Sequence, residues 1–358
     1  VYKHDLNLNP ARNVVQKIHF FRHQPICTHF IKQQLKHHTL HLRCVAFHAI
    51  FPLLCISSFN TTVILYNLLT FPPSVQCKLN DHTDMIYHIT FHPNQPLLAT
   101  SSSDMTVIIY NISVIPPTKQ QHLKHHIAGV QSVAFHPIFL LFATGSYDST
   151  IILYNLTSVA ATIKYHFKEN KTCILTVAFH PRFLILARGS YNHSVTLYNI
   201  SIIPPTIKHH LNHHTQKVLC VVFHPNVPLF ATCSSDHSTI LYNISTLTSA
   251  SLTPSSLLLF TPETLLTLSS QLTKTYVLKS YEGSVRSIAF HTHLLLLATG
   301  SNNCTVIVYD LTTSPPNIQH HLQDHINRVM SVAFHPSLPF LASCSLDKMM
   351  YLYNLDKV

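Results

Sequence analysis

Short runs of apolar residues, separated by turn residues, make up most of this chain. The stretch from Val130 to Asn155 shows the pattern: one run ends in Phe-His-Pro, the next in Ala-Thr-Gly-Ser, and the last in Tyr-Asn. Runs of five or six β-branched and apolar residues between turn signals indicate β-strands. Because these runs are apolar on both faces, we expect each strand to be buried on both sides.

The same stretch recurs seven times in register along the chain. Successive copies are 44 residues apart, with one step of 67, and in every copy a Phe-His pair lies 19 residues before a Tyr. The phenylalanines are Phe47, Phe91, Phe135, Phe179, Phe223, Phe290 and Phe334. The tyrosines are Tyr66, Tyr110, Tyr154, Tyr198, Tyr242, Tyr309 and Tyr353. A repeat of this length is typical of arrays and propellers.

Each copy predicts four short strands. In the third copy these are residues 119–123, 130–135, 140–144 and 150–154. Pro137 ends the second of them, because proline cannot donate to a strand ladder. The turn that contains Asp148 separates the third strand from the fourth.

A His before the second strand, an Asp before the fourth and an aromatic residue at the end together resemble the WD-repeat family, over residues 30–358. The resemblance implies an all-β fold, a seven-bladed β-propeller of four-stranded antiparallel blades. In that family each repeat supplies the outer strand of one blade and the three inner strands of the next. An N-terminal outer strand at about residues 30–35 would then pair with the C-terminal inner strand at 349–353 and close the ring.

The resemblance also implies a structural hydrogen-bond network in each blade, linking a His, a Ser or Thr, an Asp and an aromatic residue. The His precedes the Asp by 22 residues in all four complete sets. Asp accepts from His, and a hydroxyl bridges to the aromatic donor, so the network would hold the turn against the strands. The matching residues are His82, Thr100, Asp104 and Tyr110; His126, Thr144, Asp148 and Tyr154; His214, Thr232, Asp236 and Tyr242; and His325, Ser343, Asp347 and Tyr353.

Several positions depart from the family pattern. The chain has no Trp, so Tyr stands in its place, and only five Gly are present. Three blades lack a full network, and we expect fewer hydrogen bonds to hold their turns against their strands. The departing residues are Ile56 and Asn60; Asn170, Arg188 and Asn192; and Tyr281 and Asn303.

Two segments fall outside the repeats. Residues 1–29 do not match the pattern and form an N-terminal extension of unknown structure, ahead of the propeller at 30–358. An insertion at about 245–277 accounts for the long step between copies. Long insertions in surface loops cost little entropy.

The composition restricts the possible classes of partner and the cellular location, but it identifies no individual partner. The net charge of +10 favours acidic partners, nucleic acid or anionic surfaces, but the positive residues are not clustered in a run. The nine Cys include no C-x-x-C pair, and several of them recur at equivalent positions within predicted strands, which favours buried, reduced thiols and a cytoplasmic or nuclear location. The longest apolar runs are too short to span a bilayer.

The residues that could bind metal or act in catalysis occupy repeated positions, which indicates a structural role. Thirty His are present, but those after each Phe repeat at a strand-end turn, and others already belong to the network. We therefore expect no metal site and no cofactor, although a His-rich rim that binds metal or senses pH stays open. The His-Asp sets recur in four blades, whereas an active site is unique, and no catalytic motif is present. The chain is therefore not predicted to be an enzyme.

The sequence predicts a protein-protein interaction scaffold, acting as a monomeric propeller within a complex that binds other proteins or peptides. The alternative is a module that binds RNA or an anionic surface through its net positive charge. The residue before each turn Asp or Asn points toward the expected partner face, and aromatic side chains are favoured as interface anchors. The candidate partner-binding residues are Phe59, Tyr147, Tyr191 and Leu346.

Overall fold

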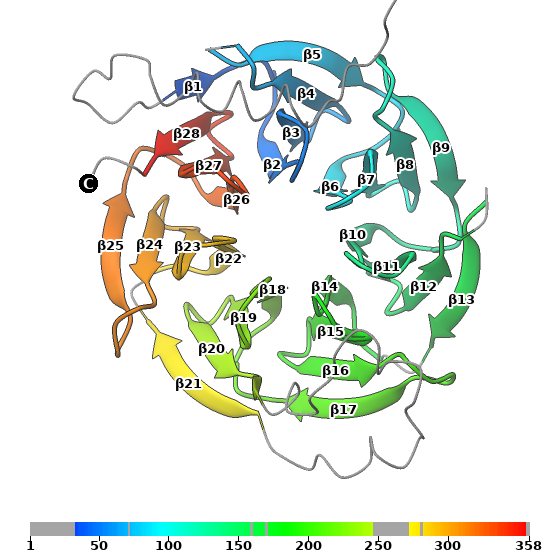
Figure 1. Ribbon diagram of the computed structural model, residues 1–358, viewed down its shortest axis with the longest axis vertical. Coiled ribbons are helices and arrows are strands. Elements are labelled where there is room, and N and C mark those ends of the chain that lie inside the picture. The colour runs from blue at the N-terminus through cyan, green and yellow to red at the C-terminus, as the bar shows by residue number, and fades with distance from the viewer. Residues whose placement is uncertain are drawn as a thin grey trace, which may run out of the picture.

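The computed structural model describes residues 33–70, 72–157, 160–168, 171–245, 272–279 and 282–355. These residues form seven four-stranded sheets, arranged as blades around a central axis (Figure 1). The predicted seven-bladed propeller is therefore confirmed. The predicted extension at residues 1–29 lies outside the described residues, and so do residues 246–271 of the predicted insertion.

The place of a strand in its blade follows its order in the repeat. The inner strands, nearest the axis, are β2 (Leu42–Phe47), β6 (Ile86–Phe91), β10 (Val130–Phe135), β14 (Ile174–Phe179), β18 (Val218–Phe223), β22 (Val285–Phe290) and β26 (Val329–Phe334). The second strands are β3 (Leu53–Ser58), β7 (Leu97–Ser102), β11 (Leu141–Ser146), β15 (Ile185–Ser190), β19 (Leu229–Ser234), β23 (Leu296–Ser301) and β27 (Phe340–Ser345).

The two remaining strands complete each blade toward its outer edge. The third strands are β4 (Val63–Asn67), β8 (Val107–Asn111), β12 (Ile151–Asn155), β16 (Val195–Asn199), β20 (Thr239–Asn243), β24 (Val306–Asp310) and β28 (Met350–Asn354). The outer strands are β5 (Ser74–Leu79), β9 (Thr118–Leu123), β13 (Thr162–Phe167), β17 (Thr206–Leu211), β21 (Thr273–Leu278), β25 (Asn317–Leu322) and β1 (Gln33–Leu35).

The outer strand of each blade comes from the following repeat, and the two ends of the propeller meet in one blade. β1 pairs antiparallel with β28, with Gln33 opposite Leu352 and Leu35 opposite Met350. The predicted closure is therefore confirmed, and it joins the first and last blades into one ring (Figure 1). β21, which begins within the predicted insertion, pairs with β20 as the outer strand of its blade.

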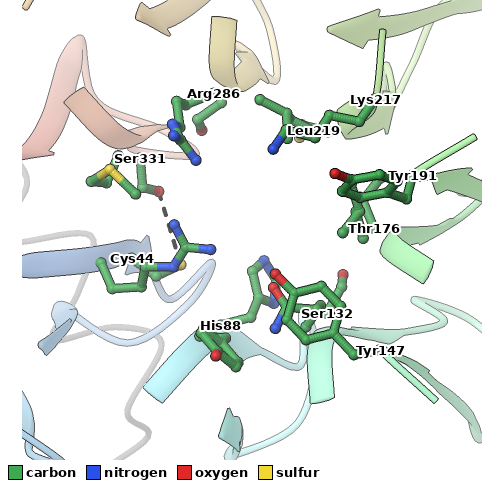
Figure 2. A pocket seen from close by; sticks show the side chains of 17 residues that line it. Cys44, His88, Ser132, Tyr147, Thr176, Tyr191, Lys217, Leu219, Arg286 and Ser331 are labelled. Carbon is green, nitrogen blue, oxygen red and sulfur yellow. Dashed lines mark hydrogen bonds between the residues drawn. The ribbon is translucent and has the colours of Figure 1, made fainter. Parts of the chain in front are cut away.

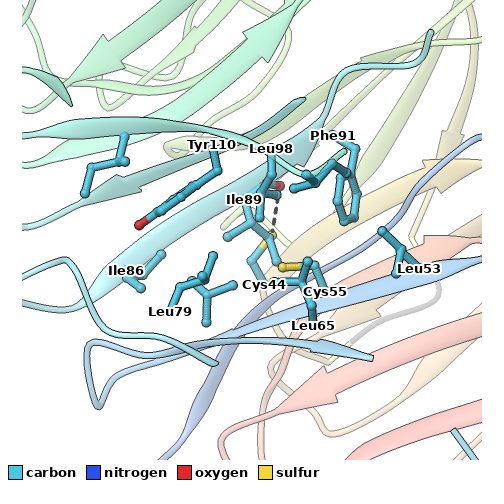
Figure 3. Close-up of a cluster of buried hydrophobic side chains, with 13 residues drawn as sticks. Cys44, Leu53, Cys55, Leu65, Leu79, Ile86, Ile89, Phe91, Leu98 and Tyr110 are labelled. Atoms are coloured by element: carbon cyan, nitrogen blue, oxygen red, sulfur yellow. Dashed lines mark hydrogen bonds between the residues drawn. The ribbon is translucent and has the colours of Figure 1, made fainter. Parts of the chain in front are cut away.

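The hydrophobic core lies between neighbouring blades. Cys44 and Leu65 of the first blade pack in one buried cluster with Ile89, Leu98 and Tyr110 of the second (Figure 3). A blade between two others needs apolar side chains on both faces of its sheet. This arrangement explains why the strand sequences are continuous apolar runs rather than alternating ones.

A ladder of histidine and phenylalanine rings joins the blades at the end of the inner strands. The His after each inner strand lies against the Phe of the next blade, with ring centroids 5.0–5.2 Å apart. The pairs are His48–Phe91, His92–Phe135, His136–Phe179, His180–Phe223, His224–Phe290, His291–Phe334 and His335–Phe47. The last pair links the seventh blade back to the first, so the ladder closes with the ring.

The turn between the second and third strands of every blade places a non-glycine residue in the left-handed region. The φ angles at these positions lie between 66° and 71°. The residues are Thr61, Met105, Ser149, His193, His237, Cys304 and Lys348. Residues with a Cβ pay roughly 1–2 kcal/mol in this conformation. The scarcity of Gly in the sequence thus has a structural cost at seven equivalent places.

Candidate partner-binding site

The side chains that line the central channel come from equivalent positions of the seven inner strands. The second and third residues of these strands, with three further side chains, enclose a cavity of about 150 Å³, which we call the channel mouth (Figure 2). The second residues are Arg43, Tyr87, Gln131, Leu175, Leu219, Arg286 and Met330. The third residues are Cys44, His88, Ser132, Thr176, Cys220, Ser287 and Ser331. The further side chains are Tyr147, Tyr191 and Lys217.

Two of the predicted partner-binding residues, Tyr147 and Tyr191, lie at the channel mouth and are exposed by 41% and 55%. Tyr147 meets the ring of Tyr87 edge-on, with centroids 6.1 Å apart. The Lys217 ammonium lies 5.4 Å from the centre of the Tyr191 ring. The two tyrosines therefore present aromatic surface to solvent from the turns that precede β12 and β16.

The other two predicted residues, Phe59 and Leu346, occupy equivalent turns but are half-buried and do not line the cavity. The Phe59 ring packs edge-on against His41, with centroids 6.0 Å apart. The imidazole of His41 also hydrogen-bonds to the backbone carbonyl of Leu346. His41 thus ties these two turns together, and their binding role stays a prediction.

None of the cations of the channel mouth was predicted from the sequence as a binding residue. Arg43 and Arg286 each occupy the second position of an inner strand, and Lys217 directly precedes β18. Burial, together with the nearby charges of Arg43 and Arg328, lowers the pKa of Arg286 to about 10. Arg286 therefore stays charged at neutral pH, although its neighbours carry the same charge. A comparison of the second strand positions across the repeats would have revealed Arg43 and Arg286, but not Lys217.

The predicted structural network has the same geometry in four blades. The His Nδ1 lies 2.7–2.8 Å from the Asp carboxylate, and its Nε2 lies 2.7–2.8 Å from the Ser or Thr hydroxyl. In the third blade, Asp148 also accepts from the backbone N–H of Ile127 and from Thr150. Burial alone would raise the pKa of Asp148, but the hydrogen bonds from His126 and Thr150 hold it well below its usual range. The carboxylate is therefore an ionised acceptor that fixes two loops.

In three of the four complete networks the repeat tyrosine is buried and hydrogen-bonds to the residue before the network His. The Tyr110 hydroxyl donates to Asp81 at 3.0 Å, and the Tyr154 hydroxyl lies 3.1 Å from His125 Nδ1. In the fourth blade Arg188 is buried, and its guanidinium donates to the Tyr198 hydroxyl at 2.9 Å and to Ser190 at 2.7 Å.

In the three blades with incomplete networks, an Asn at the position of the network Asp keeps a hydrogen bond within its turn. Asn60 Oδ1 accepts from the backbone N–H of Thr62, as Asn192 and Asn303 do in their own turns. Asn170 and Tyr281 lie outside the described residues.

The histidines show no metal-binding arrangement in the part of the chain that the structure describes. No group of three or more His, Cys, Asp or Glu side chains there is placed to hold a metal ion. The histidines that follow the inner strands instead accept hydrogen bonds. For example, His136 Nδ1 accepts from the backbone N–H groups of Ile138 and Phe139, both at 3.1 Å.

Comparison with known families agrees with this geometry. The family model WD40 (WD domain, G-beta repeat) matches residues 73–111, 117–155, 205–243, 272–310 and 316–354, which is more than half of the chain. The chain belongs to the WD40 family. The two repeats of this WD40 propeller that are not matched include the departures at Ile56, Asn60, Arg188 and Asn192.

A relative with a distant, partial match is the ribosome biogenesis protein bop1 of Danio rerio. It is 35% identical over 94 residues, which cover 23% of this WD40 chain and 12% of bop1. The chain therefore spans only a small part of this relative. None of the described segments forms a helix of the length and hydrophobicity that a membrane crossing requires.

Proposed function

We propose that this WD40 propeller is a non-enzymatic scaffold that binds partner proteins or peptides at the channel mouth. The observation that carries the proposal is the exposure of Tyr147 and Tyr191 beside the central cavity. The positions that build the blades, such as the Phe-His pair and the repeat Tyr, hold the same residue types in every copy, so recognition is sought at exposed positions where the copies differ. Aromatic side chains beside a cavity are typical anchors of protein interfaces.

Two further apolar side chains support the same face. Ile127 and Ile326 directly follow a network His, and they are exposed by 84% and 89%. The backbone N–H groups of both donate to the network aspartates Asp148 and Asp347, which fix their loops. Rigid loops that present large apolar groups to water favour binding, because little conformational entropy is lost on association.

The proposal includes the absence of catalysis and a cytoplasmic or nuclear location. The His-Asp pairs bond in the same way in four blades, which supports a structural role for them. The eight described cysteines are all free thiols, which supports a reducing compartment. The partial similarity to a protein named for ribosome biogenesis supports the nucleus. We also propose that residues 1–29 and the part of the insertion before β21 are accessory to the propeller at 30–358, whereas residues 273–277 of the insertion belong to the blade.

Affinity capture from cell extract, read by mass spectrometry, tests the scaffold proposal. Tyr147→Ala and Tyr191→Ala should each lose one or more of the proteins captured by the unchanged chain. Ile138→Ala is the matched control, because Ile138 is 62% exposed in the loop between β10 and β11, at the other end of the blade. If both tyrosine variants captured the same proteins as the control, the assignment of the binding face would be wrong.

The alternative function is binding of RNA or an anionic surface, which the net charge of +10 favours. Salt separates the two functions. Phosphate contacts release counterions, so affinity for RNA should fall by orders of magnitude between about 50 and 200 mM salt. A packed interface built on Tyr147 and Tyr191 should change little over the same range.

A further inference from the structure

The cations and the exposed aromatic rings of the channel mouth are unevenly distributed among the blades. Arg43, Lys217 and Arg286 come from the blades that begin with β2, β18 and β22. Tyr147 and Tyr191 come from the blades that begin with β10 and β14, and Lys217 lies next to Tyr191 (Figure 2). None of the side chains that line the cavity is an Asp or a Glu. The cavity therefore holds a concentration of positive charge beside aromatic rings.

The hydrogen-bonding capacity of these cations is only partly used. Arg43 Nε is buried and has no hydrogen-bond partner, and its guanidinium lies 5.6 Å from the centre of the Tyr87 ring. Arg286 donates from Nε to Asn302 Oδ1 at 2.7 Å. Within the described residues, no carboxylate forms an ion pair with Arg43, Lys217 or Arg286. A buried, unpaired donor on a charged group costs free energy that an incoming acceptor recovers.

We propose that the channel mouth receives the oxyanion of one acidic side chain from a partner protein, either a carboxylate or a phosphorylated hydroxyl; this rests on the proposed scaffold function. Guanidinium groups bind both oxyanions in a two-pronged geometry. An anion among the three cations also offsets their mutual repulsion. Tyr147 and Tyr191 contact the apolar stem of the same side chain.

The size of the cavity favours a single side chain over a larger ligand. At about 150 Å³ it is smaller than the roughly 300–1,000 Å³ of sites for drug-sized ligands. A cavity of this volume takes a group the size of a benzene ring. A nucleotide, with its base, sugar and phosphate, exceeds that volume, so we favour a peptide over RNA as the source of the anion.

Fluorescence polarisation with short labelled peptide pools tests this inference. The pools share randomised uncharged flanks and differ only at a fixed central residue, which is Glu, phosphoserine, Gln or Ser. We expect the Glu or the phosphoserine pool to bind at least ~10-fold more tightly than its neutral counterpart. The tighter of the two identifies the source of the oxyanion. A short uridine RNA is titrated under the same conditions.

Arg43→Gln and Arg286→Gln should each remove most of the preference for the anionic pool. Arg182→Gln is the matched control, because it removes one guanidinium from an exposed position between β14 and β15, away from the channel mouth. Thermal unfolding of all variants shows that they are folded, and Arg43→Lys should restore part of the preference.

Equal binding of charged and neutral pools would overturn the oxyanion site. So would an anionic preference that survives both arginine changes, or RNA binding tighter than every peptide pool. The scaffold function is judged separately. If peptide pools bound regardless of charge and Tyr191→Ala weakened them, the scaffold would stand and only the oxyanion inference would fail.

Discussion

Acidification is expected to unfold this propeller well above the pH at which carboxylates titrate, because of the histidines that follow the inner strands. Each accepts two backbone N–H groups at Nδ1, as His180 does from Arg182 and Phe183, both at 3.1 Å. A proton on Nδ1 would face those donors and break both bonds. Burial lowers the pKa of five of these histidines from 6.5 to about 4. They are His92, His136, His180, His224 and His335.

The magnitude follows from the difference in proton binding between the two states. Between pH 6.5 and 4 the unfolded chain holds protons on these histidines and the folded chain does not, so the free energy of unfolding falls as the pH falls. With these pKa values, each histidine lowers the free energy of unfolding of the protein by about 2 kcal/mol at pH 5. Five of them approach about 10 kcal/mol, which is the full stability of a typical domain. The network aspartates add a separate loss below about pH 4, where an unfolded Asp becomes protonated.

Urea unfolding followed by circular dichroism, from about pH 7.5 to 5, measures this effect. We expect the free energy of unfolding to fall across this range, and the fall to be smaller by about 2 kcal/mol in His136→Asn. Asn keeps an acceptor near the Nδ1 position but does not titrate. His237→Asn, at an exposed turn, is the matched control and should keep the pH dependence of the unchanged chain. A pH-independent stability, or a His136→Asn variant with the unchanged slope, would refute the reasoning.

Three further substitutions test local features of the blades by urea unfolding at neutral pH. Met105→Gly should stabilise the protein by about 0.5–1 kcal/mol, because Gly adopts the φ of 68° without strain; a loss of stability would contradict this. Gly145→Val should destabilise it by about 1–3 kcal/mol, because a Cβ there would lie 2.6 Å from Ile174 Cγ2; an unchanged midpoint would show that the blades can separate. Asp148→Asn should cost about 1.5–3 kcal/mol by removing the charged acceptor of His126; a neutral effect would mean that the amide serves equally well.

The repeat period made the architecture predictable, because every blade needs the same apolar residues at the same spacing. Strand ends were less certain: the third strand of the third unit runs over Leu141–Ser146 rather than 140–144. The ladder continues to Ser146 because Ser146 pairs with Val130 of β10, across a register shift between Val130 and Ser132. Local propensity does not report the pairing with a neighbouring strand.

The proposed partner face was only partly predictable from the sequence. The four candidates occupy equivalent turns, yet Tyr147 is exposed and Phe59 is not, because His41 from a neighbouring loop covers the Phe59 ring. Arg43 and Arg286 lie far apart in the chain and belong to no motif. They become neighbours of one cavity only when the ring closes, which is a property of the assembled blades.

The uneven distribution of charge around the channel mouth would fix the orientation of a partner bound at the proposed site. A backbone with seven equivalent blades offers seven equivalent rotational settings, and choosing one of them costs about 1 kcal/mol in orientational entropy. Because Arg43 and Arg286 come from other blades than Tyr147 and Tyr191, one setting would be favoured for a side chain with an acidic end. The placement of the charges, more than their total, would then determine the angle of the bound partner. Moving one guanidinium, by Arg43→Leu with Leu175→Arg, would keep the net charge and turn the partner around the axis.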